Sequence, residues 1–291
     1  MVRIRRAKRS DKKHILSFCS STFNWGDYID QVWDFWYSDK SGQLLVAEYC
    51  SEQIALSHVA VCPDKKTAWI EGIRVHPSYR RSQIASKLIG KMIDYSMKKG
   101  AHQASAIVAA DNIASQRMME KNGFEVISKW SYYSTNSNNM QKQKSDARFA
   151  TPDELESIWQ YLEQSRIYQL SAKRYFNSWH WYVLDRKTLK NFVNEGRVIM
   201  VGKPPVINGL AIINKDGYWD TTNVLQIIYL DSQSAGSIQH IISFVTSLYI
   251  DSKFDRLQVL CHKSKSMTSF VDKFMIKEQE QFLLYSKIFT L

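Results

Sequence analysis

The order of strands and helices predicted for the first half of this sequence occurs again in the second half. In residues 1–135 a short strand and two helices precede three strands, after which helices and strands alternate. The second half has the same order, from a short strand at 147–150 and a capping box at 151–154 to a last strand at 282–289. Repetition of a whole element order indicates an internal duplication.

This element order predicts a mixed α/β (α+β) fold made of two similar domains. Short polar turns join the three strands of an antiparallel meander at residues 44–49, 54–61 and 67–75. Helical periodicity comes next at 84–99, so each domain should be a mixed, mostly antiparallel sheet flanked by helices. A polar stretch without hydrophobic periodicity separates the halves. We expect a first domain at 1–137, a linker at 138–146 and a second domain at 147–291.

Charge and cysteine content narrow the classes of function. The net charge is +11, and seven of the first 13 residues are basic, but no zinc-finger, basic-zipper or RNA-binding pattern is present. Charge alone therefore predicts no nucleic-acid partner. No apolar run approaches the roughly 20 residues that span a bilayer, and the N-terminus lacks a secretory signal. The four cysteines show no close pairing and no metal-ligand spacing, so we expect a cytoplasmic protein without a metal. We also expect no membrane partner and either a monomer or a homodimer.

The segment from Ile73 to Ala85 carries the clearest chemical signal. A strand ends at Pro77, a basic loop with Arg80 and Arg81 comes next, and a helix then begins. Free backbone N–H groups and the helix dipole favour a phosphate at such a helix N-terminus. The segment therefore predicts an anion site.

The same segment resembles the coenzyme motif of the GNAT superfamily of acyl-CoA-dependent N-acyltransferases, V-x-P-x-x-R-x-x-G-x-G/A. Val75, Pro77, Arg80 and Ala85 match this motif, and Gln83 replaces its central glycine. Glycine allows the backbone to approach a pyrophosphate closely, so the replacement implies a shifted loop or a lower affinity.

A second segment, from Asn112 to Phe124, resembles the family pattern N-x-x-A/S-x-x-x-Y-x-x-x-G-F. Asn112, Ser115 and the Gly123-Phe124 pair match it, and Met119 stands at the position of the tyrosine. In the family that tyrosine often protonates the departing thiolate, which methionine cannot do.

The resemblance implies acetyl-CoA as the co-substrate, held by main chain of a strand that parts from its neighbour and by the loop that enters the helix. By position, the implied coenzyme-binding residues are Ile73, Arg74, Val75, Arg80, Arg81, Ser82, Gln83, Ile84, Ala85, Ser86, Asn112, Ser115 and Met119.

Acetyl transfer requires a neutral amine, and free amines have a pKa of roughly 8 to 10.4, so a base must remove a proton. Many relatives place a glutamate on the strand that holds Glu71, which makes Glu71 the predicted catalytic residue. The alternatives are that Glu71 pairs structurally with Arg74 and that His58 is the base.

In this fold the substrate usually meets the loop between the first two helices. The candidate substrate-binding residues there are Trp25, Asp27 and Tyr28, whose rings could flank a substrate and whose carboxylate could hold an ammonium. The alternative is that both rings belong to the core and that Asp27 only caps a helix.

The second half lacks the features of a coenzyme site. The loop after Leu230 has no arginine, and Asp231 would repel a pyrophosphate. We therefore expect a degenerate GNAT-like domain that has lost coenzyme binding. Trp179, His180 and Trp181 are placed either at a substrate cleft or in a packed element.

The predicted function is transfer of an acetyl group from acetyl-CoA to a primary amine of a small molecule, amino acid or peptide. The segment Glu71–Val75 with a tandem second half also resembles histidine N-acetyltransferase-type members, which makes an amino acid one option. The alternative is a sensor or regulatory module that binds acetyl-CoA with little or no catalysis, which Gln83 and Met119 favour.

Overall fold

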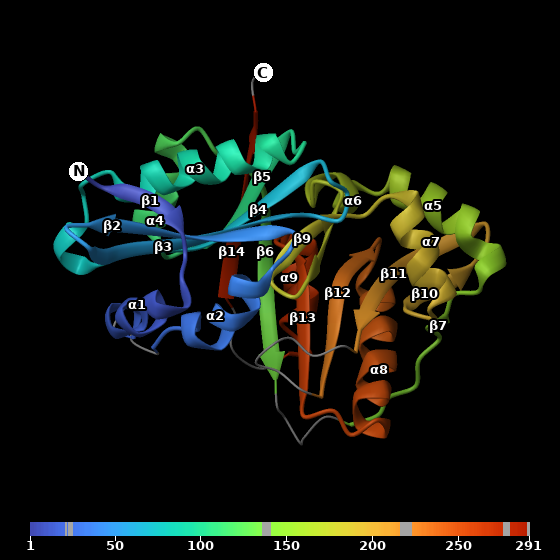
Figure 1. Ribbon diagram of the computed structural model, residues 1–291. Coiled ribbons are helices and arrows are strands. Elements are labelled where there is room, and N and C mark those ends of the chain that lie inside the picture. The colour runs from blue at the N-terminus through green and yellow to red at the C-terminus, as the bar shows by residue number, and fades with distance from the viewer. Residues whose placement is uncertain (21, 23–25, 136–140, 216–222, 276–279, 290–291) are drawn as a thin grey trace. The chain divides into compact units, whose positions relative to one another are not determined.

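The computed structural model describes residues 1–20, 22, 26–135, 141–215, 223–275 and 280–289 (Figure 1). These residues form two compact units. Unit 1 comprises Met1–Val108, Asn112–Val126 and Leu284–Leu291, and unit 2 comprises Ala109–Asp111 and Ile127–Leu283.

Unit 1 is a sheet with helices on both faces. Its strands are β1 (Arg3–Arg6), β2 (Gly42–Tyr49), β3 (Glu52–Val61), β4 (Thr67–Val75), β5 (Gln103–Ala109) and the later part of β14 (Glu280–Ile288), in the order β1-β2-β3-β4-β5-β14. Its helices are α1 (Lys12–Cys19), α2 (Ile29–Ser38), α3 (Ile84–Lys98) and α4 (Ile113–Lys121). Strands β1 to β4 pair antiparallel, and β4 pairs parallel with β5.

The helices of unit 1 bury the faces that the sequence pattern predicts. Helix α3 packs its Leu88 and Met92 face against β3 and β4, while α1 and α2 cover the opposite face of the sheet (Figure 1). Val32 and Trp36, one turn apart on α2, are both buried. The sheet is thereby closed on both sides around the middle of β3 and β4.

Unit 2 has the same kind of layering. Its strands are β6 (Glu125–Thr135), β7 (Arg148–Phe149), β10 (Val198–Lys203), β11 (Val206–Asn214), β12 (Val224–Ser232) and β13 (Arg256–His262), in the order β6-β13-β12-β11-β10-β7. Its helices are α5 (Leu155–Gln164), α6 (Arg166–Leu170), α7 (Arg186–Asn194), α8 (Ala235–Asp251) and α9 (Lys265–Val271). The core lies between α8 and β10 to β13, where Ile241 and Val245 pack with Ile213 and Leu225.

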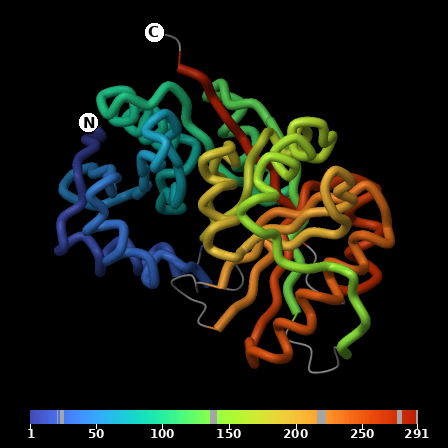
Figure 2. Tube along the Cα trace, turned by 90° about the vertical axis from the view of Figure 1, so that its right-hand side faces the viewer, coloured from blue at the N-terminus to red at the C-terminus, as the bar shows by residue number. Residues whose placement is uncertain are grey.

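The two units take strands from both halves of the chain. Residues from Leu284 on belong to unit 1, where Ser286 donates to Ala104 O and Phe289 N donates to His102 O. The end of the chain accordingly runs beside β5 in both views (Figures 1 and 2). Residues from Ile127 on belong to unit 2, where β6 pairs with β13. The ranges 1–137, 138–146 and 147–291 stay a prediction about domains, and the contact-based units have different limits.

The fold class is confirmed: the sheets are mixed and mostly antiparallel, with flanking helices. The elements that the pattern did not predict lie in unit 2, and they are α6, α7 and a hairpin of β8 (Arg174–Asn177) and β9 (His180–Val183). Trp181 lies on β9 and is fully buried, which accords with a packed element.

Candidate active site

A β-bulge interrupts β4 in the middle of the predicted site. The register with β3 shifts so that Gly72 and Ile73 lie opposite Ser57 alone. Gly72 has a φ of +65°, a left-handed conformation that glycine adopts without a Cβ clash. A Cβ on Gly72 would also lie 2.5 Å from ring carbons of Trp36. The position therefore requires glycine both for the backbone and for the close approach of Trp36.

Strands β4 and β5 part beyond the start of their pairing. That pairing covers Thr67 to Trp69 of β4, which are buried, whereas Glu71 and the residues from Ile73 to Val75 are only half-buried. A strand that leaves its neighbour can offer main-chain groups to a ligand. This part of β4 thus fits the extended amide chain of a coenzyme A arm.

The loop after β4 has the form of an anion cradle. A 3-10 turn at Pro77–Tyr79 leads to the exposed residues Arg80 to Gln83, and α3 begins at Ile84. Gln83 has φ +59° and ψ +15°, so the residue that replaces the family glycine takes a conformation that favours glycine. Arg81 also has a positive φ, +65°. At the helix N-terminus Ile84 is buried, whereas Ala85 and Ser86 are half-buried.

Side chains hold this loop in place. Tyr79 Oη donates to Glu52 Oε2 over 2.8 Å, and Arg80 Nε donates to Val75 O over 3.2 Å. The ring of Tyr79 also packs edge-on against His76, whose Nδ1 accepts from Ser78 N. The turn is therefore built before any ligand arrives, with both arginines on its outer side.

The second predicted segment forms the start and body of α4. Asn112 Oδ1 accepts from Ser115 N over 3.0 Å and caps the helix. Met119 is 1% exposed, so it packs inside unit 1. Near the end of α4, Asn122 Nδ2 donates to Ser86 Oγ over 3.1 Å, which joins this segment to the N-terminus of α3.

Glu71 lies in a line of three charged side chains, which we call the Glu71 triad: Asp39, His58 and Glu71. His58 Nδ1 lies 2.8 Å from Glu71 Oε1, and His58 Nε2 lies 3.3 Å from Asp39 Oδ2. The second contact is an ion pair without hydrogen-bond alignment. Burial favours a neutral imidazole, yet the two carboxylates raise the pKa of His58 above its ordinary value. Burial would raise the pKa of Asp39, but its contact with His58 and its hydrogen bonds with Ser41 lower it.

Two further residues shape the triad. The Trp36 ring stacks on the His58 imidazole with centroids 4.8 Å apart and planes 6° from parallel. Gly42 leaves the room that the Asp39–His58 contact occupies, because a Cβ there would lie 2.3 Å from Asp39 Oδ2 and 2.8 Å from His58 Nε2. Asp39 was not among the residues predicted from sequence. The only local signal was an acid just after a helix, three residues before a glycine.

The predicted substrate residues lie on the chain between α1 and α2. Asp27 forms a bidentate pair with Arg74, at 2.7 Å to Nε and 3.0 Å to Nη2, and its side chain is 2% exposed. The Tyr28 ring lies 5.2 Å from the Arg74 guanidinium. Arg74, predicted to bind the coenzyme, therefore anchors this loop to β4. Trp25 lies outside the described residues.

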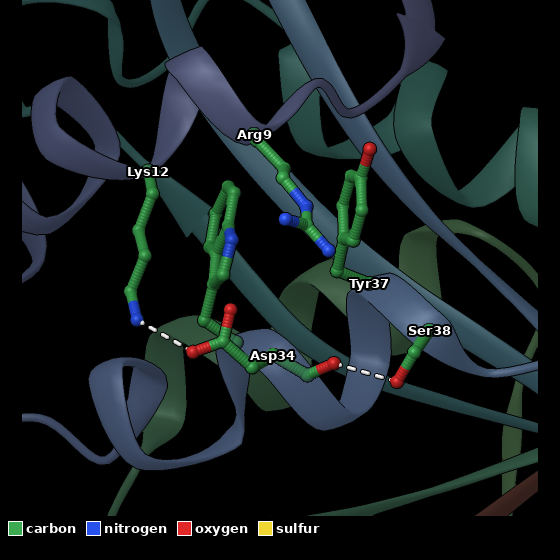
Figure 3. Close-up of a pocket in the computed structure, with 6 residues that line it drawn as sticks. Arg9, Lys12, Asp34, Tyr37 and Ser38 are labelled. Carbon is green, nitrogen blue, oxygen red and sulfur yellow. Dashed lines mark hydrogen bonds and ion pairs between the residues drawn. The ribbon is translucent and has the colours of Figure 1, made fainter.

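A surface cavity of about 490 Å³ lies on the outer side of α1 and α2 (Figure 3). Its lining residues are Arg9, Lys12, Trp33, Asp34, Tyr37 and Ser38. None of the predicted site residues lines it; Lys12 Nζ lies 3.0 Å from Asp34 Oδ2, and the Arg9 guanidinium lies over the Tyr37 ring. We therefore place the candidate site at the bulge of β4 and not in this cavity.

In unit 2, Asp231 does not lie in an open loop. It is 2% exposed and accepts hydrogen bonds from the hydroxyls of Tyr161, Tyr229 and Ser165. Burial raises the pKa of Asp231 above its ordinary value although these hydroxyls oppose the shift. The next loop, from Ser232 to the start of α8, contains no basic residue.

Among the residues that the structure describes, no group of three or more His, Cys, Asp and Glu side chains is arranged to hold a metal ion. Within the same residues, no helix is both long enough and apolar enough to cross a membrane.

Comparison with known proteins bears on the same part of the chain. Residues 12–124 match the model of the acetyltransferase (GNAT) family. No protein among the curated sequences matches the chain.

Solved structures share the fold over nearly the whole chain. A GCN5-related N-acetyltransferase from Sphaerobacter thermophilus is 11% identical over 99% of this chain and 95% of its own, with a TM-score of 0.65. A GCN5-related glucosamine N-acetyltransferase region of a fungal multi-domain beta-N-acetylglucosaminidase is 12% identical, with a TM-score of 0.67 over 99% of this chain and 38% of its own. Residues 12–124, which hold β2 to β5 and the Glu71 triad, are thus a match to the GNAT acetyltransferase family, within a fold shared with GCN5-related N-acetyltransferases.

Proposed function

We propose that unit 1 transfers an acetyl group from acetyl-CoA to a primary amine of a small molecule, amino acid or peptide. The observation that carries this proposal is the position of Glu71. Its carboxylate side chain is 12% exposed and lies at a bulge, two residues before the stretch of β4 that has parted from β5. A base and a strand edge for the coenzyme arm therefore occur side by side.

In this proposal the coenzyme lies along β4 and ends on the loop before α3. Main-chain groups of Ile73 to Val75 would pair with the pantetheine arm, and an N–H there would hold the thioester oxygen as charge develops on it. The N-terminus of α3 and the exposed Arg80 and Arg81 would bind the pyrophosphate. Asn112, Ser115 and Met119 would lie near the arm.

Glu71 would act as the general base. It accepts a proton from the ammonium form of the substrate, directly or through one water, and the neutral nitrogen then attacks the thioester carbonyl. The new C–N bond forms as the C–S bond breaks and the sulfur departs as a thiolate, and the nitrogen, which is cationic after the attack, gives its second proton to water or to the departing sulfur. Met119 is a buried thioether and cannot donate a proton, so the thiolate takes its proton from water or from another side chain, or leaves unprotonated.

Substrate contacts would come from the chain between α1 and α2. Asp27 already pairs with Arg74, so we propose that this pair positions the loop and that the Tyr28 ring contacts the substrate. An ammonium group would then approach Glu71.

We also propose that unit 2 is a degenerate GNAT-like domain without a coenzyme. The supporting observation is Asp231, which places a buried acid before a loop that contains no basic residue. Residues that would bind a pyrophosphate in unit 1 have no basic equivalent there.

A second candidate function is supported by two replacements. The left-handed Gln83 and the buried Met119 depart from the family pattern at the pyrophosphate and at the thiolate. Both fit a module that binds acetyl-CoA and turns it over slowly or not at all.

One experiment separates these functions. Release of free thiol from acetyl-CoA is measured across amino acids, polyamines and peptides, beside thermal stabilisation of the protein by acetyl-CoA. We expect stabilisation and turnover with at least one amine. Stabilisation without turnover would indicate the sensor, and the absence of both would contradict any coenzyme-dependent role.

A further inference from the structure

The Glu71 triad contains two residues that no general base requires by itself. Asp39 comes just after α2, His58 lies on β3 and Glu71 lies on β4, so three separate elements supply them. His58 is 1% exposed, and its ring is covered by Trp36. Burying charged groups is costly, so an arrangement that keeps an imidazole between two carboxylates calls for an explanation.

Resting on the proposed function, we infer that Asp39 and His58 are positioning residues for Glu71. His58 fixes the orientation of the Glu71 carboxylate, and the opposite charges of His58 and Asp39 set the pH at which Glu71 accepts the proton of the amine.

The charges around the triad support this inference. Three groups in the described part of the chain face His58. They are the carboxylate of Glu71 on β4, the carboxylate of Asp39 just after α2, and the neutral ring of Trp36 on α2. With His58 protonated, the Glu71 triad carries one net negative charge. The neighbouring Arg74 is matched by Asp27, so that pair adds no net charge.

Two phenols near the triad remain neutral. Burial raises the pKa of Tyr28, whose neighbours include Arg74 and Glu71. Burial also raises the pKa of Tyr95 on α3, which lies close enough to Asp39 to feel its charge. The surplus negative charge therefore belongs to the triad itself, and it favours uptake of a proton from a cationic substrate.

The two supports act in opposite directions on Glu71. The imidazolium beside Glu71 favours the ionised carboxylate, whereas Asp39 favours a proton on the triad. Removing Asp39 would leave a balanced His58–Glu71 pair that holds a proton weakly. Removing His58 would take away the imidazolium beside Glu71, so Glu71 would ionise only at higher pH. The three groups titrate together, and the profile reports the triad as a whole.

The residues around Asp39 leave space for its contact with His58 and hold its carboxylate in place. Gly42 is the residue whose Cβ would strike both Asp39 Oδ2 and His58 Nε2, and Ser41 binds Asp39 through its N–H and its hydroxyl, each over 2.7 Å. These groups fix the Asp39 carboxylate on the side of His58 away from Glu71.

The test is the pH dependence of kcat for the wild type, Asp39→Asn and His58→Gln. We expect the acidic limb to move to lower pH by about one unit in Asp39→Asn and to higher pH by about one to three units in His58→Gln. Asp11→Asn is the matched control, because Asp11 is a buried carboxylate of unit 1 bound to Arg5, remote in sequence from the triad. It should lose stability and keep the wild-type profile.

Acetyl-CoA binding by each variant, read by calorimetry, shows that the site is intact. Variants that bind acetyl-CoA yet share the wild-type pH profile would overturn the inference, while the proposed function would stand. A wild type that turns over no amine overturns the proposed function.

Histidine NMR tests the coupling without turnover. The His58 resonance, assigned by its loss in His58→Gln, should titrate at lower pH in Asp39→Asn and in Glu71→Gln than in the wild type. Unchanged titration in both variants would overturn the triad itself, and Glu71→Gln keeps this test available if Asp39→Asn fails to fold.

Discussion

The central strands of the two units are both bulged, but the chain beyond the bulge differs between them. In β4 the bulge lies at Gly72 and Ile73, and in β12 the register shift leaves Ile228 unpaired between Ile227 and Tyr229. Each strand also pairs parallel with its neighbour only over its first residues. The same backbone irregularity therefore occurs in both sheets.

The end of β12 is buried, whereas the end of β4 is partly exposed to solvent. Every residue of β12 from Val224 to Asp231 is buried, whereas β4 is half-buried from Ile73 to Val75. After β12 comes a buried acid held by three hydroxyls, and after β4 comes a loop with two exposed arginines. Both units thus have a bulge and parted strands, and we propose that the accessible strand end and the charge of the next loop allow unit 1 to bind a ligand.

The first strand and the turn after it are built alike in the two halves of the chain. Arg5 of β1 binds Asp11, and Arg148 of β7 binds Glu154, six residues later in both cases. Each acid also accepts the N–H of the residue three positions before it, Lys8 or Thr151. This repeated arginine-to-cap pair agrees with an internal duplication, and the two copies differ chiefly around their central strands.

The largest expected effect comes from replacing Glu71, the proposed base of unit 1. Glu71→Gln should lower kcat by about 10²–10⁴ while acetyl-CoA affinity stays the same, because the amide is nearly isosteric but cannot take up the proton. The rate of the variant should recover as pH approaches the pKa of the amine. Stopped assays of product at several pH values measure this. Full activity of the variant at every pH would remove Glu71 from the mechanism.

The next effect distinguishes the two loops. Arg80→Glu or Arg81→Glu should weaken acetyl-CoA binding by about 1–3 kcal/mol each, the range for a lost charge-assisted hydrogen bond. Gln233→Glu, in the exposed loop of unit 2, should change nothing. Titration calorimetry at low and high salt measures both, and the arginine effects should shrink at high salt. Equal effects of the substitutions in the two loops would contradict the proposal that only the loop of unit 1 binds acetyl-CoA.

Two buried histidines should respond to pH in opposite directions. The pKa of His58 is raised by two carboxylates, so its contribution to stability is present below pH about 6.5 and is lost as pH rises through the folded value. Burial lowers the pKa of His262 to about 4, so folding loses stability as pH falls from about 6.5 towards that value.

We therefore expect His58→Gln to cost more free energy of unfolding at about pH 5.5 than at about pH 8.5. His262→Gln should cost less at the lower pH than at the higher. Urea unfolding at both values gives the four differences. Parallel pH dependence of the two variants would show that His58 is not held as an imidazolium.

The smallest effect concerns the backbone of the coenzyme loop. Gln83→Gly should stabilise the protein by about 0.5–1 kcal/mol, because Gln83 holds a left-handed conformation that costs a residue with a Cβ. Urea unfolding measures this gain. Glu195→Gly in unit 2, where φ is −81°, serves as the control and should not stabilise. A loss of stability in Gln83→Gly would mean that the side chain makes contacts worth more than the strain.

Sequence patterns predicted most of the fold because a long segment with regular hydrophobic periodicity indicates its own secondary structure. The helix at 84–99 and the meander at 44–75 correspond to α3 and to β2 to β4. The hairpin β8–β9 was missed because its strands have four residues each, too few to show alternation. The exchange of β6 and β14 between the units depends on pairing between distant segments, which no local pattern records.

The candidate site was predictable only where a motif spans neighbouring residues. Glu71 and the loop from Arg80 to Ala85 lie within one short stretch of sequence, so the family pattern could indicate them as candidates, whereas the role of Gly72 in the bulge was not predicted. Asp39 meets His58 only through the packing of α2 on the sheet, and this contact requires that position 42 carry no Cβ. No sequence pattern indicated the pair of Asp27 and Arg74, because 47 residues separate the two partners.

The central claim is that unit 1 alone holds the coenzyme, and titration calorimetry of the full chain with acetyl-CoA tests it most directly. We predict one site per chain, lost or strongly weakened in the double variant Arg80→Glu and Arg81→Glu and unchanged in Gln233→Glu. Two sites per chain, or one site that survives the double variant, would contradict the account.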